Sequence, residues 1–256
     1  MDWGEPKSLE DWLVTPLPPV KLIIGDGILI EQAKMVLYGV FKSGKSTMVD
    51  YIAMCLAGGI PLFGKPEYRC EKSKVLVLQL EMPHVPFMTR LMGSQLAGLS
   101  DVRKNLMVKS MPFLKLADDQ SFNWLSTTIK KHKPDVLVID PIYKMMTGDE
   151  NNARDVTDLT DRFDTLMTAY GFSLIMTHQS RKQTFSKDGA VDTGEAEIRG
   201  STALLQWVDT IIGVRKMTDP YRKVSITKRW AGFNGIQPFT EETVCLDLQT
   251  GMYKTK

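Results

Sequence analysis

The sequence predicts an α/β domain in which helices flank a mostly parallel central sheet and antiparallel strands follow at the C-terminal end. Three observations support this fold class. The apolar runs at residues 74–80 and 135–140 are typical of strands that are buried on both faces. Segments with the apolar spacing of helices alternate with these runs. A glycine-rich segment, residues 39–46, joins a strand-like run to a helical one, as in α/β proteins.

Composition and charge exclude several classes of protein. The 256 residues are 43% hydrophobic and 24% charged, as in an ordinary globular domain, and the net charge is only +2. Any nucleic-acid contact must therefore come from local clusters of cations. The three cysteines are widely spaced and lack a C-x-x-C or histidine partner, which argues against disulfides and zinc. No apolar run has membrane-spanning length and no signal peptide is recognisable, so we expect a cytoplasmic protein without membrane contact.

Residues 1–22 are expected to form an N-terminal arm. Residues 9–13 favour a short amphipathic turn, and the prolines around it favour an extended segment after it. Two interpretations remain open. The arm packs on its own domain as a strap, or it docks on a neighbouring subunit through Trp12 and Leu13.

Strands and helices are expected to alternate over the middle of the chain. In order, we expect a turn at 25–27, a strand at 35–38, a helix at 47–57, a strand at 74–80, a helix at 85–99, a short strand at 106–109, a helix at 122–131, a strand at 135–140, a helix around 159–167 and a strand at 172–177. Polar loops at 147–153 and 180–197 separate the later elements. A helix from about Thr202 should follow.

The end of the chain contains three further strand-like runs, at 210–214, 224–228 and 244–248. Turns at 219–220 and 233–235 separate them, so we expect these runs to extend the sheet with antiparallel strands. No linker indicates a second independent domain, and residues 23–256 are expected to form one domain.

The segment GVFKSGKS, Gly39–Ser46, fits the phosphate-binding P-loop pattern G-x-x-x-x-G-K-[ST]. Gly39 and Gly44 allow a tight turn that points backbone N–H groups at one anion. Lys45 should reach the β- and γ-phosphates of ATP, and the Ser46 hydroxyl should coordinate Mg²⁺. A simple strand-to-helix turn is the alternative. We prefer the P-loop because the full pattern lies between a strand and a helix. The candidate nucleotide-binding residues are Gly39, Val40, Phe41, Lys42, Ser43, Gly44, Lys45, Ser46 and Thr47.

Polar residues at the ends of three predicted strands are candidate catalytic groups, because ligands of an open parallel sheet lie at the carboxyl ends of its strands. Asp140 has the position of a Walker B acid that holds Mg²⁺ directly or through water. Glu81 is placed to orient or deprotonate the water that attacks the γ-phosphate. His178 and Gln179 are placed to sense the γ-phosphate and move the following loop. The alternatives are solvated strand-end carboxylates and a structural histidine.

The motifs GVFKSGKS, LQLEM, VLVID, THQ and RGS, in this order, resemble those of the RecA-like ATPases. The likeness is closest to the branch of RepA-type hexameric plasmid helicases and their phage relatives, and it runs from about residue 25 to 235. It implies a RecA-like P-loop NTPase core that binds ATP and Mg²⁺. It also implies that Glu81 is the catalytic carboxylate, that His178 or Gln179 is the γ-phosphate sensor, and that the loops after Asp140 and Gln179 face DNA.

The resemblance also implies a shared active site, since RecA-like motors usually receive a basic residue from the adjacent subunit. Lys228 and Arg229 close a predicted strand and match that place. Arg199 and Arg215 are the competing candidates, and an exposed strand-end cation without such a role is the alternative for each.

The chain is expected to form a hexameric ring or a filament. Contact with single-stranded DNA is expected from cations in the two polar loops, which converge on one axis in a ring. A solvated charged loop is the alternative, because carboxylates dilute both clusters. Phe185 is a candidate for stacking on a base. The cations are Lys144, Arg154, Arg181, Lys182 and Lys187.

These observations favour an ATP-hydrolysing motor of the replicative helicase or translocase type. A phage-type recombination or single-strand annealing ATPase is the first alternative. A nucleotide-switched regulatory ATPase or a small-molecule kinase, without DNA, is the second. A kinase would need an arginine-bearing lid and an acceptor pocket, whereas Gln179 and the strand-end cations favour coupling between subunits.

Overall fold

A computed structural model of the chain describes residues 5–16, 19–179, 202–228, 236–247 and 249–255. Several predicted positions lie outside the described residues: Arg181, Lys182, Phe185, Lys187, Arg199 and Arg229. The strands are β1 (Leu22–Ile24), β2 (Leu29–Ile30), β3 (Lys34–Gly39), β4 (Val75–Gln79), β5 (Leu106–Ser110), β6 (Val136–Asp140), β7 (Ser173–Gln179), β8 (Thr210–Lys216), β9 (Tyr221–Lys228), β10 (Phe239–Asp247) and β11 (Met252–Thr255). The helices are α1 (Leu9–Val14), α2 (Lys45–Gly58), α3 (His84–Met92), α4 (Ser100–Asn105), α5 (Asp119–His132), α6 (Ala153–Tyr170) and α7 (Thr202–Trp207), with 3₁₀ turns η1 (Leu62–Gly64), η2 (Pro66–Tyr68), η3 (Gln95–Gly98) and η4 (Ile142–Met145).

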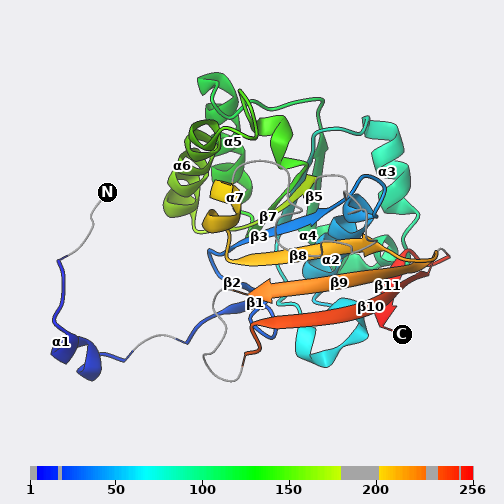
Figure 1. Ribbon diagram of the computed structural model, residues 1–256, viewed down its shortest axis with the longest axis horizontal. Coiled ribbons are helices and arrows are strands. Elements are labelled where there is room, and N and C mark those ends of the chain that lie inside the picture. Colours follow the sequence, from blue (N-terminus) through cyan, green and yellow to red (C-terminus); the bar gives the residue numbers. More distant parts are fainter. Residues whose placement is uncertain (1–4, 17–18, 180–201, 229–235, 248, 256) are drawn as a thin grey trace, which may run out of the picture.

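A nine-stranded sheet with the order β11-β10-β9-β8-β3-β7-β6-β4-β5 forms the centre of the molecule (Figure 1). The strands from β8 to β5 in this order are parallel, and β9, β10 and β11 are antiparallel. Every residue of β4 and β6 is buried, as their continuous apolar runs predict. The predicted fold class is confirmed.

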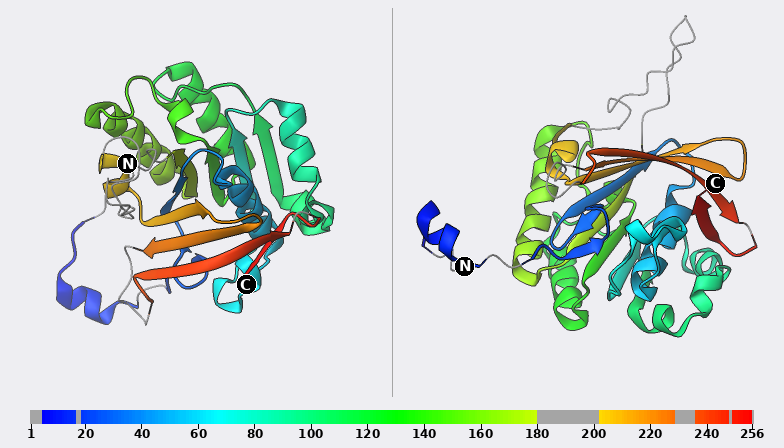
Figure 2. Two further views of the ribbon diagram at one scale, coloured as in Figure 1. Left: turned by 45° about the vertical axis from the view of Figure 1, so that its right-hand side comes forward. Right: turned by 90° about the horizontal axis from the view of Figure 1, so that it is seen from below.

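Helices cover both faces of the sheet and bury one hydrophobic core on each (Figure 2). The first core lies between the sheet and α2, α3 and α4. Its centre is α2, in which residues 48–57 are all buried, so this helix is covered on every side. The second core lies between the sheet and α5, α6 and α7. The helix that follows the P-loop is therefore held rigidly inside the domain.

Some elements differ from the sequence prediction. β8 pairs with β3 in parallel, so only two of the three C-terminal runs are antiparallel. Helix α7 leads into β8, and a helical crossover is typical of parallel pairing. The helix expected at 85–99 ends at Met92, because Gly93 follows and Ser94 caps a separate turn. β1, β2 and β11 were not predicted, since two to four residues are too short for a clear period.

The predicted amphipathic turn of the N-terminal arm is the helix α1. Ser8 and Asp11 form a capping box at its start, which fixes this short helix. None of its residues is buried, and Figure 1 shows α1 away from the sheet, on the side of β1 and β2. The helix therefore does not pack as a strap on its own domain. None of the helices in the described part of the chain is long and apolar enough to cross a membrane.

Candidate nucleotide-binding site

The P-loop connects β3 to α2, as predicted. Gly39 ends β3, and a Cβ atom there would lie 2.3 Å from the carbonyl oxygen of Val214 on β8. Gly44 caps α2 with a φ of 99°, a conformation that favours glycine. Each of the two motif glycines is therefore required for a steric reason of its own. The unpaired N–H groups at the start of α2 face the loop and favour an anion.

Lys45, the first residue of α2, lies folded against the loop. Its Nζ atom donates hydrogen bonds to the carbonyl oxygens of Gly39, at 2.7 Å, and Val40, at 2.9 Å. Burial lowers the pKa of Lys45 below the usual value of a lysine, although the negative charges of Asp140 and Glu81 oppose this effect. The ammonium group is thus held where the phosphates of a nucleotide would lie.

Asp140, at the end of β6, is the hub of a hydrogen-bond network. One carboxylate oxygen accepts from the hydroxyl of Thr177, and also from that of Ser46 at 3.4 Å. The other oxygen accepts from the side-chain amide of Gln79 at 2.7 Å. Asp140 is almost completely buried, so these donors stabilise a carboxylate that has little contact with water. β6 lies between β4 and β7, which supply Gln79 and Thr177.

Gln79 also positions the backbone of Glu81. Its side-chain oxygen accepts hydrogen bonds from the N–H groups of Glu81, at 2.8 Å, and Met82, at 3.0 Å. One buried amide therefore connects the predicted Walker B acid to the backbone of Glu81, the predicted catalytic residue. Neither Gln79 nor Thr177 was predicted as a site residue. Both are polar residues within apolar strands. A buried polar side chain needs a hydrogen-bond partner, so this pattern in the sequence could have indicated them.

A pocket of about 220 Å³ brings most of the predicted residues together. It is lined by Phe41, Lys42, Gly44, Lys45, Ser46, Thr47, Glu81, Asp140, Pro141, Thr177 and Gln179. Glu81 is exposed at this pocket, as a residue that contacts an attacking water should be. Ser43 is fully buried behind the loop, and Val40 contributes its carbonyl group.

His178 and Gln179 belong to β7, and they do not follow the strand as predicted. Successive side chains of a strand point to opposite faces. Thr177 and Gln179 accordingly line the nucleotide pocket, whereas His178 lines a small separate cavity against Leu159 of α6 and Leu204 of α7. Of the two candidate γ-phosphate sensors, only Gln179 reaches the pocket.

Lys228 is not presented at a surface as a residue acting in trans would be. Its Nζ atom lies 2.6 Å from the Asp26 carboxylate, and its side chain is only 1% exposed. It is level with the start of β3, at the end of the sheet opposite to the P-loop. By contrast, Arg215 is exposed on β8 near the end of β3 that carries the loop. The ion pair with Asp26 gives Lys228 a structural role in this conformation.

An ion pair between a buried carboxylate and a partly buried arginine connects α2 to α3, the helix that follows Glu81. The Arg90 Nε atom lies 2.6 Å from a carboxylate oxygen of Asp50. Asp50 lies one turn after Ser46 on α2. Burial raises the pKa of Asp50 to about 7, against the opposing effect of the Arg90 charge. This pair was not predicted, because its members are distant in sequence.

We expect Arg90→Met to destabilise the fold by about 3 kcal/mol at pH 8, because it leaves Asp50 buried without its counter-ion. Since the folded-state pKa of Asp50 is raised above its unfolded value, ionisation opposes folding as pH rises, and protonation relieves this effect as pH falls below about 7. The loss of stability should therefore be smaller at pH 5. Urea unfolding of wild type and variant at both pH values measures it. Arg103→Met, at an exposed position of α4, is the control, and a pH-independent loss would contradict the explanation.

The residues of the pocket fit a Mg²⁺-nucleotide complex. The Ser46 hydroxyl and the Asp140 carboxylate are within hydrogen-bonding distance, and Mg²⁺ prefers such oxygen ligands. In the described part of the chain, no cluster of three His, Cys, Asp or Glu side chains forms a separate metal site. Ser46 and Asp140 would hold a bound Mg²⁺ here, and its charge would offset that of the phosphates.

Comparison with known families agrees with this geometry. A family model described as AAA domain matches residues 4–184, which is more than half of the chain and includes the P-loop, Glu81, Asp140 and Gln179. No curated protein sequence matches the chain. The motif, the buried acid and the family match all indicate a nucleotide-binding ATPase. The chain therefore belongs to this AAA-domain family of P-loop ATPases.

Proposed function

We propose that this ATPase is a motor that acts on single-stranded DNA, of the replicative helicase or translocase type. One observation carries the proposal: both loops that are expected to face DNA begin at residues of the nucleotide pocket. Pro141 lines the pocket and leads directly into η4, which carries Lys144. Gln179 lines it and ends β7, where the second loop starts. A change in the phosphate contacts can thus move both loops.

The motor is proposed to work as a homo-oligomer, in a hexameric ring or a filament. Among the described residues that line the pocket there is no arginine, although lysines Lys42 and Lys45 are present. Phosphoryl-transfer sites commonly use an arginine to stabilise charge in the transition state. A residue of the adjacent subunit would supply it. Arg215 is exposed at the P-loop end of the sheet, and Arg229 and Arg199 stay the other arginine candidates for this role.

We expect single-stranded DNA to increase the ATPase rate of the wild type about tenfold or more. In the variant with Lys144→Ala and Arg154→Ala, the increase should be much smaller and the DNA affinity lower, because phosphate contacts dominate such binding. Steady-state ATPase rates at rising DNA concentration, at two salt concentrations, measure both effects. Lys254→Ala, an exposed lysine on β11, is the matched control.

The same assays separate the alternatives. An ATPase rate that does not respond to DNA, with no DNA binding at low salt, would contradict a DNA motor and favour a regulatory ATPase. Stimulation without ATP-dependent unwinding of a forked duplex would favour an annealing or recombination protein. Electron microscopy with DNA and nucleotide would show a ring or a filament.

A further inference from the structure

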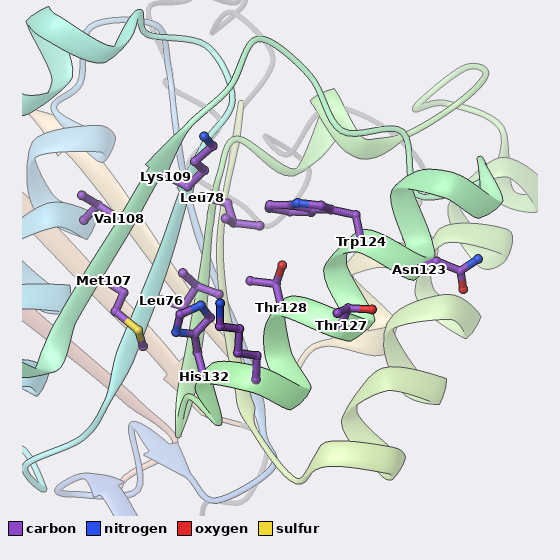
Figure 3. A pocket seen from close by; sticks show the side chains of 11 residues that line it. Leu76, Leu78, Met107, Val108, Lys109, Asn123, Trp124, Thr127, Thr128 and His132 are labelled. Atoms are coloured by element: carbon purple, nitrogen blue, oxygen red, sulfur yellow. The ribbon is translucent and has the colours of Figure 1, made fainter.

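A groove of about 700 Å³ lies at the edge of the sheet, between β5 and α5 (Figure 3). β5 is the last strand on this side, so its outer edge has no neighbour among the described strands. The groove shares no residue with the nucleotide pocket, and its lining is Leu76, Leu78, Met107, Val108, Lys109, Asn123, Trp124, Thr127, Thr128, Lys131 and His132.

The groove combines an apolar floor with a basic rim. Figure 3 shows Leu76 and Leu78 between β5 and α5, with the ring of Trp124 of α5 beside Leu78. Lys109 and Lys131 are exposed, and no carboxylate is among the lining residues. Such a surface fits a short apolar segment that carries negative charge.

The helix α1 has this chemistry. Leu9, Trp12 and Leu13 have the spacing of one helical face, and they are 74%, 44% and 79% exposed. Glu10 and Asp11 supply negative charge, and the latter closes the capping box that preforms the helix. A preformed helix loses little conformational entropy when it docks. The chain thus exposes an acidic apolar helix and, elsewhere, a basic apolar groove.

We propose that α1 of one subunit docks in the groove between β5 and α5 of a second copy of the chain, with Trp12 against the apolar floor and Glu10 near the lysines. The inference rests on the proposed homo-oligomer and adds the surfaces that join its subunits. The contact is heterologous, because two different surfaces meet, so it can be repeated around a ring or along a filament. Within one chain, α1 makes no buried contact that would compete with this docking.

Crosslinking between two differently tagged chains tests the contact. One chain carries Leu13→Cys and the other Thr127→Cys, both with Cys245→Ser, since Cys55 and Cys70 are buried. A short bis-maleimide should join the two chains when they are mixed with Mg²⁺ and a non-hydrolysable ATP analogue. Two results would overturn the proposal. One is a crosslink that forms only within a chain that carries both cysteines, and the other is an assembly in which the mixed chains are not crosslinked.

The assembly equilibrium provides a second test. Trp12→Ala should weaken self-association about tenfold or more in sedimentation velocity, because buried tryptophans dominate interfaces. Met217→Ala, at a residue that is similarly exposed, is the matched control. Lys131→Glu should also weaken assembly, and Glu10→Lys in the same chain should restore part of it.

Unchanged self-association of the Trp12→Ala variant would overturn the docking but leave the proposed motor function intact. DNA-stimulated ATPase of a wild type that stays monomeric would overturn the docking and the proposed homo-oligomer but not the action on DNA, whereas a DNA-insensitive ATPase would overturn the action on DNA.

Discussion

The variant Glu81→Gln is expected to bind ATP about as well as the wild type and to hydrolyse it about 10² to 10⁴ times more slowly, the usual effect of removing a general base. Glu81 lines the pocket, and its backbone is fixed by the buried Gln79. The substitution keeps the size of the side chain and removes its charge. Binding should be unaffected because the P-loop and Lys45 hold the phosphates without help from this residue.

Single-turnover hydrolysis and fluorescent-nucleotide binding separate the two effects. Glu71→Gln changes a glutamate that is exposed away from the pocket, and it controls for loss of charge. Wild-type turnover in Glu81→Gln would show that another group activates the water. A large loss of nucleotide affinity would instead place Glu81 in binding, and either result would contradict the role assigned to it.

The sequence predicts the central architecture because the patterns that define it are local in the chain. Each buried strand is a continuous apolar run, and the P-loop is a motif within eight residues, so neither depends on distant contacts. The direction of β8 could not be predicted in this way. It depends on which strand β8 pairs with after a helical crossover. The apolar run of β8 would look the same in a parallel and in an antiparallel strand.

The details of the site depend on pairs of residues that are distant in sequence. Gln79 meets Asp140 because β4 and β6 are adjacent, in a register that pairs these two residues. Asp26 meets Lys228 across 202 positions, and this ion pair buries the side chain of a residue that the sequence favoured as a trans-acting cation. The choice between His178 and Gln179 depended on where β7 ends. Because β7 extends two residues beyond its predicted end, both residues belong to the strand, and their side chains point to opposite faces of the sheet.

Lys45→Ala is expected to weaken ATP binding by about 10² to 10⁴-fold and to remove measurable hydrolysis. Its ammonium group now bonds to two P-loop carbonyls and should exchange them for phosphate oxygens, and two hydrogen bonds to a charged group are together worth about 3 to 6 kcal/mol. Isothermal titration with Mg²⁺-ATP measures the loss. Lys74→Ala, at an exposed lysine outside the pocket, is the control.

The pH dependence of ATP binding gives an independent check of the same role. Burial lowers the pKa of Lys45, so the free protein should lose this positive charge at a lower pH than an ordinary lysine would. Wild-type affinity for ATP should therefore fall as pH rises toward the usual range of lysine, and bound phosphates should raise the pKa again. The Lys45→Ala variant should lack this dependence. If wild type and variant lose affinity in parallel as pH rises, Lys45 is not the group that titrates, and its ammonium does not hold the phosphates as proposed.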